Sequence, residues 1–271
     1  MRLMILGSAA AEGVPALFCH CATCREARRR GGKDLRRRTA YLWDDVLVDF
    51  GPDLIGQTLA FGLDLSRLRH LLVTHTHGDH FLPEYLLFRR PGYSAVPSDA
   101  MLTVHGNEAV RRGVEALPLP LAELQVQCRT IRAGEEIALG EGRSALALRA
   151  AHNPEEECLL YLLRSPGGAI LIANDSGWWP EETWERLAQE RVDVAIIDCT
   201  YGLSTNLGGH LPATEVIHAA AELRRLDILS PTGRVLANHF SHNGRCLQAD
   251  LEARLGPEGI EVGYDGMVVE V

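Results

Sequence analysis

The sequence predicts an α/β protein, and three observations support this fold class. The chain has 271 residues, enough for one domain with a sizeable buried core. Its apolar runs are short and rich in branched residues, and several of them stop abruptly at a histidine or a carboxylate. Helix-like segments separate these runs. Strands that deliver such side chains at one edge of a sheet build a single site.

The composition is that of a water-soluble globular protein. Hydrophobic residues make up 46% of the chain, and no apolar run approaches the roughly 18 residues of a membrane helix. Residues 1–7 are too short for a signal peptide and are predicted to form the first strand, so we expect a cytoplasmic protein without a membrane partner. A net charge of −9 argues against binding long nucleic acid, although metal ions can still hold a small anionic substrate. A homodimer is compatible with these features.

A small-residue loop over residues 7–15 follows the first strand and leads into a cysteine motif. The three thiols have C-x-C-x-x-C spacing: Cys19, Cys21 and Cys24. Reduced thiols at this spacing can surround one tetrahedral zinc ion, so residues 19–24 are predicted to form a small zinc-binding loop. A fourth ligand is needed. His20 lies between two of the cysteines and would point away, which leaves His242 as the better candidate. The alternative is a disulfide or ordinary buried cysteines.

A basic run occupies the helix-like segment that follows and ends in Gly31-Gly32. Its members are Arg25, Arg28, Arg29, Arg30, Lys33, Arg36, Arg37 and Arg38. We interpret the run as a solvated face. A less favoured interpretation is that one or two of the arginines line the mouth of a cleft and attract phosphate.

Residues 39–43 and 46–50 resemble a hairpin around Asp44-Asp45, and a short helix should begin after Asp53. The next run, residues 69–74, has the pattern of a buried strand that opens into a loop. Further along the chain the pattern predicts a helix at 83–90, a strand at 101–104, a helix at 107–116 and a helix at about 213–226. His105 is expected to cap a strand, and His70 and His218 are interpreted as packed or surface histidines.

Four metal-ligand side chains fall within six residues after the strand at 69–74. They are His75, His77, Asp79 and His80. In extended backbone, alternate side chains leave on the same side, so the first two imidazoles can reach one cation. Gly78 permits a turn that aims the carboxylate and the third imidazole at a neighbouring position. The stretch therefore predicts two metal ions, whereas a chance cluster of surface histidines would not give this spacing.

Three later strands end on the same kinds of residue. The strand at 145–152 ends on His152, the strand at 168–175 ends on Asp175, and the strand at 234–239 ends on His239. Another strand lies at 158–164. This recurrence predicts that the strand tips converge on one site.

The His-x-His-x-Asp-His pattern resembles that of the metallo-β-lactamase superfamily. The resemblance implies a four-layer αββα sandwich formed by a single domain over residues 1–271. It also implies that His152 is the next ligand, that Asp175 bridges both metals with its two oxygens, and that His239 completes the second site. Asp49 matches an acidic residue that buttresses the metal loop, with an exposed turn carboxylate as the alternative.

The three cysteines together with His242, three residues after His239, resemble a narrower group, the PhnP-like phosphodiesterase branch of the carbon-phosphorus lyase pathway. This resemblance extends from the cysteine loop to about Cys246. It implies that His242 completes a structural zinc site. His210, just before the predicted helix at 213–226, matches a histidine proposed as the acid that protonates the leaving group. The alternative is a loop histidine without a chemical role.

The complete predicted ligand set is His75, His77, Asp79, His80, His152, Asp175 and His239. With two divalent cations it carries a formal charge of +2, or +1 with a bridging hydroxide, which suits an anionic ester. We therefore expect a metal-dependent phosphodiesterase that hydrolyses a small diester through a metal-bridging hydroxide. The PhnP-like resemblance implies that this diester is a ribose cyclic phosphate or a cyclic nucleotide. Zinc, manganese or iron fits this ligand set, and the thiolate site prefers zinc. Asp79 and His210 are the expected catalytic residues, and Asp198 is expected to support the site.

Two aromatic residues, Trp178 and Trp179, follow Asp175 closely and are interpreted as packing residues rather than a platform for a sugar or a base. A transfer-RNA 3′ endonuclease shares the metal motif but carries a long basic arm, and the sequence contains no such insertion. A lactamase or thioester hydrolase commonly departs from the full ligand set. A protein similar to pyrroloquinoline quinone biosynthesis protein B, which handles a cofactor, shares the N-terminal cysteines. Asp79, both metal sites and His210 favour hydrolysis.

Overall fold

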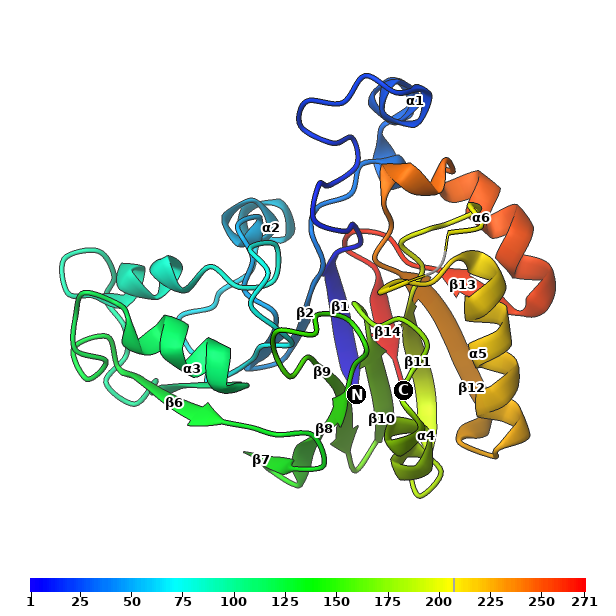
Figure 1. The fold of residues 1–271 in the computed structure, drawn as a ribbon. Helices are drawn as coiled ribbons and strands as arrows, with labels where there is room; N and C mark the ends of the chain where they lie inside the picture. Colours follow the sequence, from blue (N-terminus) through cyan, green and yellow to red (C-terminus); the bar gives the residue numbers. More distant parts are fainter. Residues whose placement is uncertain (207) are drawn as a thin grey trace.

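Two mixed β-sheets lie face to face at the centre of the computed structural model, which describes residues 1–206 and 208–271 (Figure 1). The first sheet has seven strands in the order β14 (Val268–Glu270), β1 (Arg2–Gly7), β2 (Ala40–Trp43), β3 (Val46–Val48), β4 (His70–Leu72), β5 (Leu102–Gly106) and β6 (Val126–Thr130). The second sheet also has seven, in the order β13 (Ile260–Val262), β12 (Leu229–Asn238), β11 (Val192–Asp198), β10 (Gly168–Ala173), β9 (Leu159–Ser165), β8 (Arg143–Arg149) and β7 (Glu136–Gly140).

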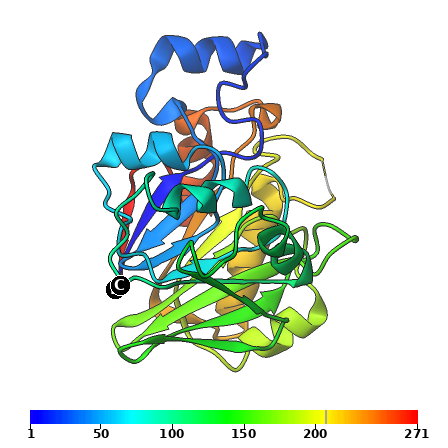
Figure 2. The same cartoon turned by 90° about the vertical axis from the view of Figure 1, so that its left-hand side faces the viewer.

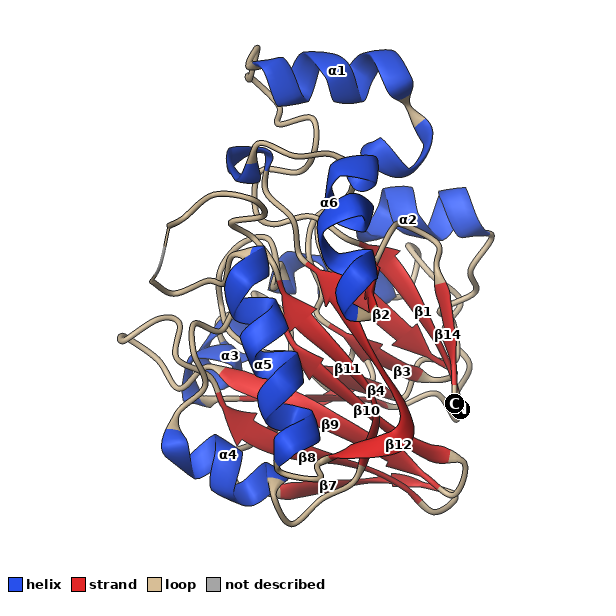
Figure 3. Ribbon diagram, turned by 90° about the vertical axis from the view of Figure 1, so that its right-hand side faces the viewer, coloured by secondary structure: helices blue, strands red, loops and turns tan. Residues whose placement is uncertain are grey.

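Helices cover the outer face of each sheet, so the predicted αββα layering is confirmed (Figure 3). The α-helices are α1 (Ala22–Arg30), α2 (Leu54–Phe61), α3 (Glu108–Glu115), α4 (Glu181–Leu187), α5 (Ala213–Arg225) and α6 (Gln248–Leu255). Helices α2 and α3 pack on the first sheet, and α4, α5 and α6 pack on the second. Helix α1 projects beyond the sheets at one end of the molecule (Figure 2). Among the described residues, no helix combines the length and the apolar character needed to cross a bilayer.

The central strands of the second sheet are rich in apolar residues because both of their faces are buried. In β9, Leu159 and Tyr161 point into the core between the sheets, whereas Leu160 and Leu162 point toward the helices. Strands β10, β11 and β12 run parallel, so their carboxyl ends meet at the same edge of the sheet. This edge is where the predicted site should lie.

Most of the predicted elements are present, with three local differences. The hairpin is confirmed, since β2 pairs with β3 antiparallel. The segment Pro83–Arg89 is a 3₁₀ helix rather than an α-helix, and it begins with a proline. Strand β8 ends at Arg149, so His152 lies in the following loop and not at the strand tip. His105 lies inside β5 instead of capping it.

The interpretation of the basic run as a solvated face is wrong for Arg36. Its side chain is buried, with the residue 5% exposed, and its guanidinium donates hydrogen bonds to Ser8 Oγ, the carbonyl of Gly263 and Gln248 Oε1. Burial lowers the pKa of Arg36 to about 10. An arginine can be buried in this way because its guanidinium donates to well-placed acceptors and lies over the ring of Phe240, 4.3 Å from the centroid.

His70 and His105 form a close imidazole pair on β4 and β5, with Nδ1 of the first 3.2 Å from Nε2 of the second. Burial lowers the pKa of both rings, that of His105 to about 3. His105 therefore becomes protonated near pH 6.5 in the unfolded chain but only near pH 3 in the folded protein. We expect His105 to cost stability as the pH falls from 6.5 toward 3, with a slope of about 1.4 kcal/mol per pH unit.

Urea unfolding of wild type and His105→Gln at a series of pH values would test this expectation. The variant should lose less stability than wild type between pH 6.5 and 4, because it lacks the group that titrates. Parallel pH profiles for the two proteins would contradict it. Taking the difference between the two proteins removes the contribution of other acid-sensitive groups.

Candidate metal centre

The seven predicted ligand residues come together at the carboxyl ends of the strands, with Asp175 at their centre. Its Oδ2 lies 2.8 Å from His80 Nε2 and 3.0 Å from His239 Nε2. Its Oδ1 lies 3.6 Å from His152 Nε2. The carboxylate therefore faces histidines from three separate loops, as a group that bridges two cations would.

The histidines and carboxylates divide into two groups on either side of Asp175. In the first, His77 Nδ1 lies 2.9 Å from His75 Nε2 and 3.2 Å from His152 Nε2. The second group consists of Asp79, His80 and His239, and Asp79 Oδ2 is 2.9 Å from His80 Nε2. Within each group the ligand atoms lie within 4.8 Å of one another. Two adjacent cations fit this arrangement.

The hydrogen-bond pattern of the imidazoles also fits metal ions. Four rings use Nδ1 to hold a protein oxygen: His75 to Thr74 Oγ1, His80 to Asp49, His152 to the carbonyl of Gly209 and His239 to Thr200 Oγ1. Each of these rings then presents an unprotonated Nε2 to the centre. Buried His80 Nε2, His239 Nε2 and Asp175 Oδ2 have no hydrogen-bond partner in the described part of the chain. Lone pairs that face each other in this way need either a proton or a metal cation between them, and two cations would satisfy all of these atoms at once.

Asp49 is buried, with 1% of the residue exposed, so the alternative of an exposed turn carboxylate is wrong. It accepts hydrogen bonds from the Thr74 backbone N–H at 2.9 Å and from His80 Nδ1 at 2.7 Å. It thus fixes both the entry to the metal loop and the orientation of one imidazole. Nearby Gly51 lies so close to the loop that a Cβ there would be 1.9 Å from the Asp79 carbonyl oxygen.

Three residues of the site adopt left-handed backbone, which side chains other than glycine rarely do. The φ angles are 66° at Asp49, 48° at Asp175 and 62° at His239. Such conformations cost on the order of 1 kcal/mol each and persist only where the surroundings hold them. The last two lie just after the ends of β10 and β12 and turn the ligand away from the strand direction toward the centre.

Tyr41, which the sequence did not reveal as part of the site, joins two of these strand ends. Its phenol oxygen accepts hydrogen bonds from Asn174 and, at 2.9 Å, from Asn238 Nδ2. These asparagines directly precede Asp175 and His239. A tyrosine from the first sheet therefore aligns two ligands of the second sheet. The sequence did contain a signal for this pairing, because an asparagine directly precedes the ligand at the end of both strands.

Glu156 is a second residue that sequence reasoning missed. Its carboxylate accepts hydrogen bonds from the Thr76 backbone N–H at 3.1 Å and from Asn107 Nδ2 at 2.7 Å. Thr76 stands between His75 and His77, so Glu156 ties the metal loop to the loop that carries His152. A lone glutamate in a loop gave no sequence signal.

His210 and Asp198 form a pair beside the metal groups. His210 Nδ1 donates to Asp198 Oδ2 at 2.8 Å and lies 3.7 Å from Asp175 Oδ1. Burial lowers the pKa of His210, but the hydrogen bond and charge of Asp198 outweigh it and raise the pKa to about 9. Asp198 is itself fully buried and also accepts hydrogen bonds from the backbone N–H groups of Asp175 and Thr200. It therefore organises the end of β11.

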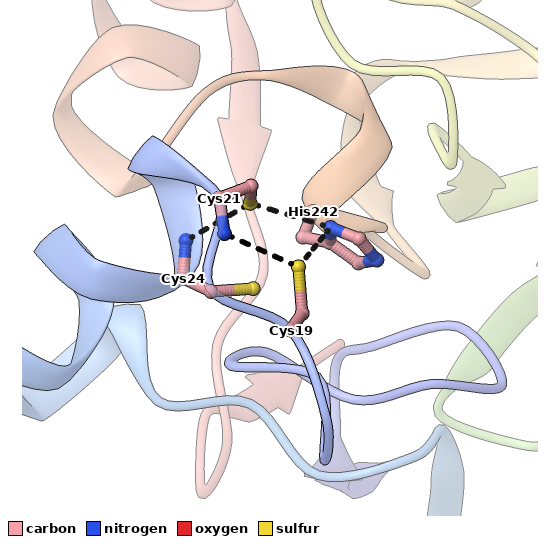
Figure 4. A group of neighbouring side chains, drawn as sticks. All are labelled: Cys19, Cys21, Cys24 and His242. Carbon is pink, nitrogen blue, oxygen red and sulfur yellow. Dashed lines mark hydrogen bonds between the residues drawn. The ribbon is translucent and has the colours of Figure 1, made fainter.

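The N-terminal cysteines and His242 form a separate tetrad near the start of α1 (Figure 4). His242 Nδ1 lies 3.6 Å from the sulfurs of both Cys19 and Cys21, and all four ligand atoms lie within 4.8 Å of one another. The cysteines are free thiols, and His20 is exposed outside the cluster. Burial raises the pKa of Cys21, but hydrogen bonds from the Cys24 backbone and His242 bring it down to about 6. Three sulfurs and one imidazole nitrogen suit tetrahedral zinc.

A cavity of about 280 Å³ opens over the His/Asp centre. Its described lining residues are Ala10, Ala11, Glu12, His77, Asp79, His152, Asp175, Thr200, Tyr201, His210, His239, Ser241 and Asn243. None of the arginines of the basic run is among them, so the less favoured phosphate-attracting role is wrong for this cavity. Trp179 is 2% exposed and stacks on Trp184, and Trp178 rests on His218. Trp179 is a packing residue, as expected, whereas Trp178 is 38% exposed, and neither is among the described residues that line this cavity.

Comparison with known proteins places this geometry among the β-lactamase-like folds. The family model described as the beta-lactamase superfamily domain matches residues 44–240. A coenzyme PQQ synthesis protein B of Methylobacterium nodulans is 26% identical to this chain, and the match covers 100% of both proteins. An octanoyltransferase of Porphyromonas gingivalis is 40% identical over 85 residues, but the match spans only 30% of this chain and 16% of that protein.

Two solved structures share the whole fold. A diphosphatase of the PhnP family superposes with a TM-score of 0.75 at 22% identity, over 100% of this chain and 98% of the other. The zinc-bound PqqB of Methylobacterium extorquens superposes with a TM-score of 0.76 at 20% identity, over 100% of each chain. Both similarities describe the fold of this chain.

Proposed function

This chain belongs to the β-lactamase superfamily, and from that premise we propose that it is a binuclear metal-dependent phosphodiesterase acting on a small, singly charged diester. The observation that supports the proposal is the Asp175 carboxylate between two groups of inward-facing imidazoles. Five histidines and two aspartates around two divalent cations leave a net formal charge of +2, which favours an anionic substrate. A cavity of about 280 Å³ fits a small ester.

Metal ions held by this set would lower the pKa of bound water and neutralise charge on the phosphoryl oxygens. The chain supplies the remaining functions. Asp49 and Thr200 orient His80 and His239. His210 lines the cavity, and because its Nδ1 is occupied by Asp198, its Nε2 is the atom available to a ligand. The hydrogen bond and charge of Asp198 raise the pKa of His210 and favour its protonated form, which can give a proton to the departing alkoxide oxygen.

His210→Ala should lower kcat by about a hundredfold while the metal content stays at the wild-type level, because a general acid typically contributes 10²–10⁴-fold. The effect should be smaller on esters of p-nitrophenol than on alkyl esters, since p-nitrophenolate needs no proton to leave. Steady-state kinetics on both ester classes, with elemental analysis of the same samples, would check this. Equal activity of variant and wild type on alkyl esters would remove His210 from the mechanism.

The proposed function is tested with the purified protein on bis(p-nitrophenyl) phosphate and on a panel of cyclic and linear phosphodiesters. Apoprotein would be reconstituted with zinc, manganese or iron, and a chelated sample would serve as the control. Turnover that appears with metal and disappears with chelator would support the proposal. No metal-dependent turnover on any diester would overturn it and favour a binding role.

A non-hydrolytic, cofactor-handling role is the second candidate, supported by the full-length match to a coenzyme PQQ synthesis protein B. The His210–Asp198 pair favours hydrolysis, because binding alone needs no proton donor at the cavity. An RNA-processing endonuclease is disfavoured by the net charge of −9 and by a cavity lining that has no lysine or arginine among its described residues. We also propose that the cysteine tetrad holds a structural zinc ion, that the protein is cytoplasmic and that it forms a homodimer.

A further inference from the structure

Glu12 is an acidic residue in the wall of the metal cavity that lies outside both ligand sets. Its Oε1 accepts hydrogen bonds from Ser241 Oγ at 2.5 Å and from Asn243 Nδ2 at 3.1 Å, and lies 3.4 Å from His242 Nε2. The partners all come from the loop that follows His239. A carboxylate held by three partners is fixed in position, although no catalytic or ligand role explains why it is there.

The fixed position of Glu12 depends on two segments that are distant in sequence. Ala10 N–H donates to the Phe240 carbonyl at 2.9 Å, and Phe240 N–H donates to the Ser8 carbonyl at 2.8 Å. The ring of His242 lies between the cysteine sulfurs at Nδ1 and Glu12 at Nε2 (Figure 4 shows the sulfur side). A carboxylate behind a zinc-binding histidine sets the orientation of the ring. Glu12 thus belongs both to the support of the cysteine tetrad and to the cavity wall.

The second carboxylate oxygen, Oε2, makes no hydrogen bond within residues 1–206 and 208–271, and the side chain keeps 30% of its surface exposed. It is therefore available to a ligand in the cavity. No lysine or arginine is found among the described lining residues, so the imidazoles are the only basic side chains in that part of the cavity wall. A carboxylate at such a position accepts hydrogen bonds from hydroxyl or ammonium groups and repels anions.

On the basis of the proposed function, we propose that Glu12 determines specificity by accepting a hydrogen bond from a hydroxyl or ammonium group on the esterifying alcohol of the substrate. The substrate class is then a phosphodiester with one negative charge at phosphorus and a polar, uncharged or cationic alcohol, such as a sugar. An additional carboxylate or phosphate on that alcohol is disfavoured.

The experiment compares four p-nitrophenyl phosphodiesters that differ only at the end of a three-carbon alcohol. The alcohols are propyl, 3-hydroxypropyl, 3-aminopropyl and 2-carboxyethyl. For the wild-type protein loaded with metal, we expect kcat/KM for the hydroxyl and amino esters to exceed that of the propyl ester by about tenfold, which is typical of a hydrogen bond to a charged group. The carboxyl ester should be the poorest substrate.

Glu12→Gln is the informative variant, because its amide oxygen can keep the contacts of Oε1 while the charge is lost. The hydroxyl-to-propyl ratio should fall toward one, and the penalty on the carboxyl ester should disappear. Glu123→Gln removes the same charge from an exposed position outside the cavity and should leave every ratio unchanged. Calorimetric titration with unreactive propyl and 3-hydroxypropyl methylphosphonates should reproduce the change as a shift in dissociation constant, and elemental analysis records zinc.

Identical ratios in wild type and Glu12→Gln, with diesters still hydrolysed, would overturn the role of Glu12 and leave the proposed function standing. No turnover of any ester would overturn the proposed function and this inference with it. Zinc loss from Glu12→Gln, together with a Cys21→Ser protein that retains Glu12 but shows the same ester ratios as Glu12→Gln, would give a different explanation. The changed ratios would then come from disorder of the cysteine loop, and the inference would be overturned.

Discussion

Asp175→Asn will lower the proposed metal-dependent phosphodiester hydrolysis by more than about a hundredfold and reduce the metal content of the His/Asp centre. Loss of a residue that only hydrogen-bonds a metal ligand typically costs 10–100-fold in metal affinity or activity. Asp175 should matter more, because it faces both groups of ligand residues directly. Its Oδ2 is 2.8 Å from His80 Nε2, and its Oδ1 is 3.6 Å from His152 Nε2. An amide keeps the shape of the side chain but replaces one oxygen by a group that cannot bind a cation.

Kinetics and elemental analysis after reconstitution would measure both effects. Asp227→Asn makes the same chemical change at an exposed position outside the site, where asparagine tolerates the φ of 55°, and it should match wild type. Full metal content and normal turnover in Asp175→Asn would show that the carboxylate does not bridge, and the two-metal interpretation would fail.

If the proposed zinc site is present, Cys21→Ser will remove one zinc ion per chain and lower the free energy of unfolding by on the order of 3 kcal/mol, equivalent to roughly 6–12 °C in Tm. Cys21 lies 3.6 Å from His242 Nδ1 and caps the first turn of α1 through a hydrogen bond from the Cys24 backbone N–H. Loss of the thiolate therefore loosens the N-terminal loop and the loop after His239 together. Turnover should fall as a consequence.

Calorimetric melting and zinc analysis would measure this loss. Cys128→Ser changes a cysteine outside the tetrad and should retain the zinc of wild type. Unchanged melting and unchanged zinc content in Cys21→Ser would rule out a zinc site that stabilises the fold. Loss of zinc with full activity would instead separate the tetrad from the active site.

The local order of residues already contained the chemistry of the site and the fold class. His75, His77, Asp79 and His80 carry ligand atoms at fixed spacing on one loop, and that spacing follows from backbone geometry alone. Apolar runs that stop at Asp175 and His239 could be recognised because a buried strand has a characteristic composition. The cysteine spacing likewise needed no distant contact to be recognised.

Only the tertiary structure decided which side chains support the metal ligands and which side chain is placed to select the substrate. Tyr41 meets Asn238 across 197 positions of sequence, and Glu12 meets Ser241 across 229. Arg36 is buried rather than solvated because Gln248 and Gly263 supply its acceptors from the other end of the chain. Short-range patterns carry no information about such pairings, since the free energy of each contact depends on a partner that the packing of the two sheets brings into place.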